Sequence, residues 1–104
     1  MTGTAIDLGE AVLDTSHRAL LFDGDEVPFT TTEFEAIVAL AERFGRPLTR
    51  DELSLRLYGA EWNGRARAVD VAVGRLRRKL HERTRGYLQI RSVRGVGYFM
   101  ISRG

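Results

Sequence analysis

Arginine is the residue type whose number and placement in this 104-residue chain could do chemistry. All but one of the 16 Lys and Arg residues are arginine, the exception being Lys79. A guanidinium group forms two parallel hydrogen bonds with a phosphate or with the edge of a guanine base. The arginine excess therefore favours an anionic partner such as nucleic acid. Because the base composition of a genome can produce the same excess, composition alone leaves both explanations open.

The charges divide along the chain. Residues 1–64 carry five basic and twelve acidic side chains, a net charge of −7, whereas residues 65–104 carry eleven basic and two acidic ones, a net charge of +9. The overall charge of +2 conceals this division. Such a chain is expected to present an acidic part to water and a basic part to a negatively charged partner.

Residues suited to catalysis or metal binding are scarce. The absence of cysteine excludes disulfides, zinc–thiolate sites and cysteine nucleophiles. The two histidines, His17 and His81, are far apart in sequence and are interpreted as structural or solvated. Without a nucleophile–base pair, a carboxylate dyad or a metal-ligand spacing, the sequence predicts neither an enzyme nor a cofactor. The segment Gly95–Gly97 is too short for a phosphate-binding fingerprint and precedes a strand.

Length and hydropathy limit the architecture. A chain of 104 residues, 43% of them hydrophobic, can bury one modest core. We expect one domain over residues 5–102, with frayed ends at Met1–Thr4 and Arg103–Gly104. No apolar run approaches the ~18 residues that a bilayer requires, and no signal peptide is visible. These observations predict a soluble, cytoplasmic protein without a membrane segment.

Short apolar runs alternate with turn residues over the first thirty positions. This spacing predicts a small antiparallel meander, and Asp23-Gly24-Asp25 is a hairpin signal between two of the runs. The four expected strands are Ala5–Leu8, Ala11–Asp14, Ala19–Phe22 and Glu26–Phe29.

Two capping boxes, Thr30-x-x-Glu33 and Thr49-x-x-Glu52, each predict the start of a helix. The first helix continues to Phe44 with apolar residues every three or four positions, and the second ends at Gly59. Only a few residues connect them, so they are expected to cross as a helix-turn-helix pair.

A third helix is expected from about Arg67 to Arg83. At 100° per residue, one face is an apolar stripe directed at the core, formed by Val69, Val73, Leu76 and Leu80. The opposite face collects Arg67, Val71, Gly74, Arg75 and Arg78, with Arg77 and Lys79 on its flanks.

A β-hairpin is expected at the C-terminal end. Its strands are Leu88–Val93 and Tyr98–Ile101, joined by a glycine-rich turn. Gly95 and Gly97 are expected to supply positive φ angles for that turn.

Four segments, in this order and at this spacing, are more specific than any one of them alone. They are Leu48–Leu53 (LTRDEL), Leu57–Gly59 (LYG), Val69–Leu80 (VDVAVGRLRRKL) and Ser92–Tyr98 (SVRGVGY). Together they closely resemble the OmpR/PhoB-type DNA-binding domain of bacterial response regulators. The start of the first helix fits the same family, and the resemblance extends from about Ile6 to Ile101.

The resemblance implies an α+β fold: a winged helix-turn-helix with an N-terminal four-stranded antiparallel sheet, three helices and a C-terminal β-hairpin wing. It implies sequence-specific double-stranded DNA binding for transcription regulation, as the output domain of a two-component response regulator. The third helix would lie in the major groove and the wing in the minor groove. Such regulators usually carry a receiver domain, absent here, so we expect an excised domain or a stand-alone relative. Family members bind direct-repeat promoter sites as tandem dimers, and we expect a monomer in isolation.

Five arginines are the principal candidates for DNA contact. Arg75 and Arg78 are expected to contact bases, because forked arginine contacts to guanine are the commonest specific device in the major groove. In the family, the position of Arg75 contacts bases or phosphate, and that of Arg77 grips the backbone. Arg94 is expected in a narrow, A·T-rich minor groove, and Arg91 near phosphate. The alternative is a merely solvated basic surface.

Several positions of the third helix leave alternatives open. Val71 could pack on a thymine methyl group or be an ordinary exposed apolar residue. Ala72 and Gly74 stand where the family often has larger side chains, and both shorten the reach toward DNA unless the backbone approaches DNA closely. Asp70 is expected to favour the positive end of the helix or to pair with an arginine such as Arg67.

The loop after the second helix is where the family engages RNA polymerase. Glu61, Trp62 and Asn63 are the candidate contacts, although Trp62 could instead fold back over the helix ends. A second class of function is also open: a protein-interaction module in which the acidic sheet of one molecule pairs with the basic helix of the next. Salt-sensitive self-association without DNA would distinguish it from DNA binding.

Overall fold

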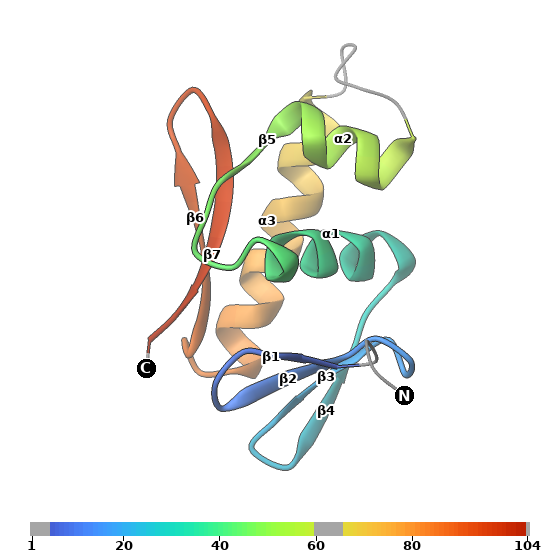
Figure 1. Ribbon diagram of the computed structural model, residues 1–104, viewed down its shortest axis with the longest axis vertical. Helices are drawn as coiled ribbons and strands as arrows, with labels where there is room; N and C mark the ends of the chain where they lie inside the picture. The colour runs from blue at the N-terminus through green and yellow to red at the C-terminus, as the bar shows by residue number, and fades with distance from the viewer. Residues whose placement is uncertain (1–4, 60–65, 104) are drawn as a thin grey trace.

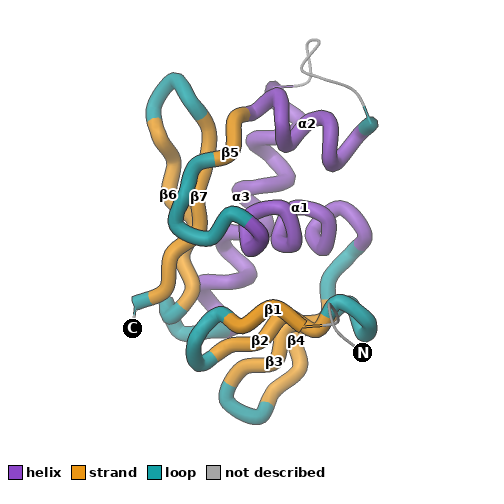
Figure 2. Tube along the Cα trace, viewed as in Figure 1, coloured by secondary structure: helices purple, strands orange, loops and turns teal. Residues whose placement is uncertain are grey.

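The computed structural model describes residues 5–59 and 66–103 (Figure 1). Within them a four-stranded sheet comes first, three helices follow, and a hairpin ends the chain (Figure 2). This α+β architecture is the predicted one. In chain order the elements are β1 (Ala5–Asp7), β2 (Ala11–Asp14), β3 (Ala19–Phe22), β4 (Asp25–Pro28), α1 (Thr31–Glu42), β5 (Leu48–Thr49), α2 (Arg50–Tyr58), α3 (Ala66–Arg83), β6 (Leu88–Val93) and β7 (Gly97–Ser102).

The N-terminal sheet is antiparallel, with the strand order β1-β2-β3-β4. Leu13 lies opposite Leu20, and Leu20 opposite Val27, so these buried side chains form one row on the face that covers the core. β1 ends one residue earlier than predicted, because the Asp7 carboxylate accepts a hydrogen bond from the N–H of Gly9 and turns the chain. β4 begins and ends one residue early.

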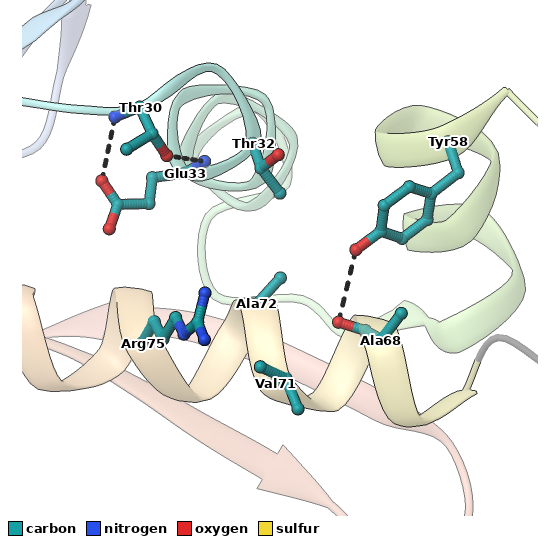
Figure 3. A pocket seen from close by; sticks show the side chains of 8 residues that line it. All are labelled: Thr30, Thr32, Glu33, Tyr58, Ala68, Val71, Ala72 and Arg75. Carbon is teal, nitrogen blue, oxygen red and sulfur yellow. Dashed lines mark hydrogen bonds between the residues drawn. The ribbon is translucent and has the colours of Figure 1, made fainter.

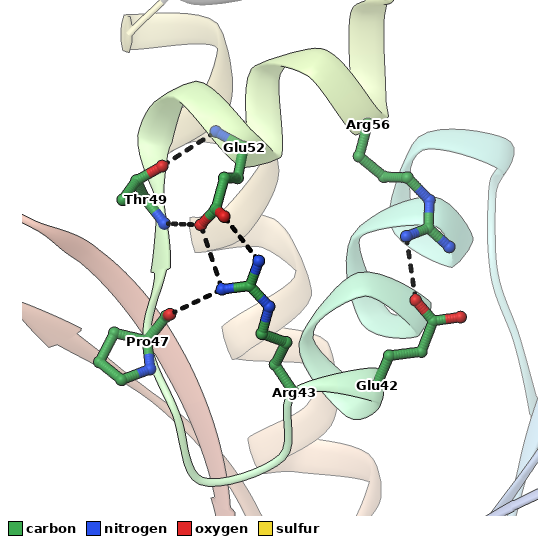
Figure 4. Close-up of polar contacts among 6 residues, drawn as sticks. All are labelled: Glu42, Arg43, Pro47, Thr49, Glu52 and Arg56. Atoms are coloured by element: carbon green, nitrogen blue, oxygen red, sulfur yellow. Dashed lines mark hydrogen bonds and ion pairs between the residues drawn. The ribbon is translucent and has the colours of Figure 1, made fainter.

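Both capping boxes start helices where the motifs predict them. At α1, the Thr30 hydroxyl accepts from the Glu33 N–H at 3.2 Å, and the Glu33 carboxylate accepts from the Thr30 N–H at 2.9 Å. Thr49 and Glu52 make the same exchange at 3.0 and 2.9 Å at the start of α2 (Figure 4). The second helix ends as predicted at Gly59, which adopts the left-handed conformation with φ 74°.

The first helix, α1, ends at Glu42, two residues before its predicted end at Phe44. The N–H groups of Arg43 and Phe44 donate to carbonyls three residues back, each at 3.2 Å, which is tighter winding than that of an α-helix. The Gly45 N–H then donates to the carbonyl of Met100 on β7. The chain therefore leaves the helix early because it is fastened to the hairpin.

α3 places its predicted apolar stripe in the core. The four residues of that stripe are all fully buried: Val69, Val73, Leu76 and Leu80. The helix packs against α1, α2 and β6, and it passes behind α1 from α2 toward the N-terminal sheet (Figure 1). Its opposite side is consequently turned outward.

A two-residue strand, β5, joins the hairpin in a second sheet with the order β5-β7-β6. The sequence does not predict β5, because two residues show no alternation. Leu48 pairs with Tyr98, and Thr49 with Gly97. Gly95 has the predicted positive φ, 76°, but Gly97 does not. A β-carbon on Gly97 would lie 1.8 Å from the Leu48 carbonyl oxygen, so the close approach of two backbones requires this glycine.

The end of the hairpin is held more firmly than expected. The Arg103 N–H donates to the carbonyl of Tyr87 at 2.7 Å, so the prediction that Arg103 frays is wrong. The other residues expected to fray, Met1–Thr4 and Gly104, lie outside the described residues. In the described part of the chain, no helix is long and apolar enough to cross a bilayer.

Candidate nucleic-acid interface

The side of α3 turned away from the core carries the predicted contact residues. We call this set the outward face of α3: Arg67, Val71, Gly74, Arg75 and Arg78. Successive members are one, three or four residues apart, so the five fall on one side of the helix. All three arginines are exposed, and Val71 is 46% exposed.

The guanidinium groups of the outward face are not paired with any described residue. Among the described residues, none makes a hydrogen bond or an ion pair with them. A β-carbon added to Gly74 would meet no atom within 4 Å, so the surface between the arginines is open. This face is therefore free to bind a ligand through uncompensated positive charge.

The hairpin of β6 and β7, the predicted wing, carries two more candidates. Arg94 lies exposed at its tip, in a turn closed by a hydrogen bond from the Val96 N–H to the Val93 carbonyl at 2.9 Å. Its guanidinium also has no partner among the described residues. Arg91 lies on β6, where Gln89 Oε1 accepts from its Nε and Nη2 at 3.2 and 2.9 Å. The wing thus presents an unpaired arginine at its tip and an oriented one on its strand.

Arg77 and Lys79 lie on the flanks of α3, as predicted. Arg77 turns toward the wing, with its guanidinium carbon 5.8 Å from the centre of the Tyr98 ring. Lys79 turns toward α1, where its Nζ donates to Glu33 Oε1 at 2.8 Å and to the Pro28 carbonyl at 3.0 Å. Lys79 therefore holds α3 against the start of α1 and does not join the outward face.

Asp70 has an arginine partner, but not the predicted Arg67. Its Oδ1 accepts hydrogen bonds from Arg50 Nε at 2.9 Å and from the Tyr98 hydroxyl at 2.5 Å. Partial burial would raise the pKa of Asp70, yet these two hydrogen bonds outweigh it and hold the pKa below its ordinary value. Arg50 reaches the site from α2, a tertiary contact that proximity along α3 does not predict.

Ala72 lies beside the outward face, not on it. It is buried, 8% exposed, in the wall of a groove of about 370 Å³ between α3, the start of α1 and the end of α2 (Figure 3). At this groove the Tyr58 hydroxyl donates to the Ala68 carbonyl at 3.3 Å. A longer side chain at this position would enter the groove, which Val71 and Arg75 of the outward face also line. That Ala72 shortens the reach of the helix toward DNA stays a prediction.

Arg43 and Arg56, which lie between α1 and α2, are paired with carboxylates. We call these two arginines together with Glu35, Glu42 and Glu52 the α1–α2 face. Arg43 lies 2.6 Å from a carboxylate oxygen of Glu52 (Figure 4). Arg56 lies 3.1 Å from Glu35 and 3.2 Å from Glu42. Guanidinium groups on this face already have their counter-charge.

The two histidines lie apart, His17 in a turn of the N-terminal sheet and His81 on α3. The described residues contain no group of three or more His, Asp or Glu side chains that could hold a metal ion. His17 Nδ1 lies 2.8 Å from Asp14 Oδ2 in an exposed turn, where hydrogen bonds from Ser16 and His17 lower the pKa of Asp14 to about 2. His81 is exposed on α3. Both positions fit the structural or solvated role predicted for them.

Some predicted contact residues lie outside the described residues, and the sequence did not predict the roles of two others. Glu61, Trp62 and Asn63, the predicted contacts to RNA polymerase, lie in the part that the structure does not describe. The roles of Arg50 and Tyr98 around Asp70 were not predicted. Both belong to the segments that carry the family resemblance. They lie 20 and 28 residues from Asp70 in the sequence, and nothing in the sequence indicates that the three side chains meet.

Known proteins resemble the chain over most of its length. The family described as "Transcriptional regulatory protein, C terminal" matches residues 24–100. The transcriptional regulatory protein CpxR of Escherichia coli K12 is 33% identical over 97 residues, which cover 93% of this chain and 42% of CpxR. The chain therefore spans less than half the length of that relative.

Solved structures agree with this match. The DNA binding domain of CpxR from E. coli has a TM-score of 0.82 at 30% identity, covering 98% of this chain and 100% of that domain. The DNA-binding domain of Klebsiella pneumoniae RstA, solved in complex with the RstA box, has a TM-score of 0.81 at 31% identity, covering 95% and 98%. The likeness thus includes the sheet, the three helices and the wing.

Proposed function

Because the chain belongs to the family of transcriptional regulatory protein C-terminal domains, we infer that it binds double-stranded DNA sequence-specifically and thereby regulates transcription. The observation that carries this inference is a set of arginines without a carboxylate partner among the described residues, on the outward face of α3 and the wing tip: Arg67, Arg75, Arg78 and Arg94. A DNA duplex supplies the missing counter-charge. The family is one of transcription regulators and not of enzymes.

The helix α3 and the wing engage adjacent grooves of the duplex. α3 enters the major groove, which is wide enough for an α-helix. Its approach is not obstructed, because Val71 and Gly74 are small and the space over Gly74 is open. The wing places Arg94 in the minor groove, where a narrow A·T-rich segment attracts a guanidinium group.

The arginines divide into base and backbone contacts. Arg75 and Arg78 contact base edges, and Arg67 lies on the same outward face of α3, nearer the start of the helix. Arg77, which is held over the ring of Tyr98, and Arg91 contact phosphate, which fixes register without discriminating sequences. Val71, exposed among these arginines, packs on a thymine methyl group.

The wider role follows from the family. The chain acts as the output domain of a bacterial two-component response regulator in the cytoplasm, where the DNA lies. If the chain is part of a longer regulator, a receiver domain in the same protein controls it; a stand-alone relative acts without one. RNA polymerase is engaged through the loop that contains Glu61, Trp62 and Asn63.

The division of charge supports tandem binding. The acidic first 64 residues of one molecule can face the basic remainder of a neighbour, so two copies bind direct repeats as a tandem dimer while the free protein is a monomer. Sedimentation at low salt tests this arrangement. Self-association without DNA that disappears at high salt would support the alternative, a protein-interaction module.

In vitro selection from random duplexes is the experiment that tests the proposed function. We expect an enriched motif with a repeat spacing near one helical turn, as for other helix-turn-helix proteins that occupy two half-sites. Selection that enriches no sequence, with binding equal on all duplexes, would contradict sequence-specific recognition.

A further inference from the structure

A cluster of four side chains joins α2, α3 and the wing. Within it, Asp70 accepts hydrogen bonds from Arg50 and from the hydroxyl of Tyr98. The guanidinium carbons of Arg50 and Arg77 lie 5.6 and 5.8 Å from the Tyr98 ring centre, within the range of cation–π attraction. We call these four residues the wing-base cluster.

The backbone attachment of the wing near this cluster is slight. β5 pairs with β7 through only two residues, Leu48 and Thr49. One further hydrogen bond runs from the Arg50 N–H to the Val96 carbonyl, at a long 3.4 Å. Two-stranded hairpins are marginally stable by themselves, so side-chain contacts at the wing base determine how firmly the tip is held relative to α3.

Asp70 is an unfavourable charge for a DNA-binding surface. It lies beside Arg67 and Val71, at the start of the outward face, where a carboxylate repels phosphates. Residues 65–104 contain one other acidic residue, Glu82, which lies exposed about three turns further along α3. What distinguishes Asp70 is its pair of hydrogen bonds, one to α2 and one to the wing.

We propose that Asp70 is a positioning residue. Through Arg50 and Tyr98 it holds the wing at a set distance from the outward face of α3, so that Arg94 and α3 engage adjacent grooves together. The purpose of this geometry rests on the proposed DNA binding, but the geometry itself is a property of the free protein and is tested without DNA.

The first test measures the distance between wing and helix. Because the chain has no cysteine, Val96→Cys at the wing tip and Glu82→Cys on α3 give two specific sites for spin labels. Pulsed electron paramagnetic resonance reports the distance distribution. We expect a narrow distribution when Asp70 is present and a broad one after Asp70→Ala.

A matched control separates positioning from the loss of a carboxylate. Glu42→Ala also removes a helix carboxylate that is paired with an arginine of α2, Arg56, but one that does not belong to the wing-base cluster. We expect the distribution to stay narrow in this variant. Broadening by both changes alike would overturn the proposal.

The second test is a double-mutant cycle on the selected duplex. Arg94→Ala alone should weaken binding by about fivefold or more. In the Asp70→Ala background we expect Arg94→Ala to cost less than about twofold, because a wing that is no longer held contributes little. Arg75→Ala should cost the same in both backgrounds. If Arg94→Ala weakens DNA binding by the same factor with and without Asp70→Ala, the proposal is overturned.

Tyr98→Phe keeps the test decisive if Asp70→Ala does not fold. It removes the hydroxyl that donates to Asp70 and leaves the ring that Arg50 and Arg77 contact. We expect the same broadening and the same loss of the Arg94 contribution. If the unchanged protein binds no duplex, the proposed function fails while the spin-label distances still decide the role of Asp70.

Discussion

The α1–α2 face and the surface formed by the outward face of α3 with the wing tip both carry arginines, but in opposite surroundings. On the α1–α2 face, Arg43 and Arg56 lie within 2.6 to 3.2 Å of glutamate oxygens. On the other surface, Arg75, Arg78 and Arg94 have no partner among the described residues. We therefore propose that the availability of the charge, and not the residue type, distinguishes the DNA-binding surface from the α1–α2 face.

This difference follows from what each pair contributes. Exposed ion pairs contribute little to stability, about 0–1 kcal/mol each, so those of the α1–α2 face mainly orient side chains. Such an arginine would have to give up a carboxylate before it could bind a phosphate. An unpaired arginine gives up only water. DNA should therefore select the second surface.

The largest expected effect is on salt dependence. If the unpaired arginines and their neighbours neutralise roughly six phosphates, log K should fall against log salt with a slope of about −5, a loss of about 10³ between 50 and 200 mM. Fluorescence anisotropy over that salt range measures it. A DNA affinity that does not change with salt concentration would contradict the claim that unpaired arginines bind the phosphates.

Arg77 lies between the two classes, because its guanidinium is held over Tyr98 but has no carboxylate partner in the described part of the chain. Arg77→Ala should weaken binding to selected and scrambled duplexes by the same factor and reduce the magnitude of the salt slope by about 1. Titrations on both duplexes measure it. A loss confined to the selected duplex would make Arg77 a base contact instead.

Gly74 tests how open the outward face is. Gly74→Ala should raise the stability of the free protein by about 1 kcal/mol, because alanine favours helix and the added β-carbon meets no atom within 4 Å. Thermal unfolding should show a midpoint about 4 °C higher. An unchanged or lower midpoint would contradict the open surface. A loss of DNA affinity in this more stable variant would show that DNA approaches the backbone here.

Low pH should reduce the stability that the paired carboxylates contribute to the fold. A hydrogen bond from Arg43 lowers the pKa of Glu52, and the bond from Lys79 lowers that of Glu33 despite its partial burial. A carboxylate with a lowered folded pKa stabilises the fold above its unfolded value, here 4.5, and loses that contribution as the pH falls.

The free energy of unfolding should therefore decrease as the pH falls below about 4.5. Glu52→Gln should flatten this decrease, and urea titrations at several pH values measure it. A Glu52→Gln variant with the same pH dependence as the unchanged protein would show that its pairing with Arg43 does not matter to the fold.

Local signals in the sequence predict most of the fold. The two capping boxes, the apolar stripe of α3 and the Asp-Gly turn each act over a few residues, so their elements begin within one residue of the expected positions. β5 could not be predicted, since two residues carry no period. The sequence also could not show why position 97 requires glycine. The reason is the close approach of the Leu48 backbone, which lies far away in sequence.

The candidate site is predictable in part for the same reason. The wheel of α3 places Arg67, Arg75 and Arg78 on one face from spacing alone. It cannot show which arginines meet carboxylates, nor that Asp70 is bound from α2 and the wing instead of from its own helix. Pairing is a tertiary property, and it requires the structure.

One measurement tests the distinction between the two surfaces most directly. Dissociation constants on the selected duplex, at one salt concentration, compare Arg75→Ala with Arg56→Ala, the same substitution on each surface. We predict a loss of about 5- to 150-fold for Arg75→Ala and less than about twofold for Arg56→Ala. Equal losses, or a larger loss for Arg56→Ala, would contradict the claim that unpaired arginines form the DNA-binding surface.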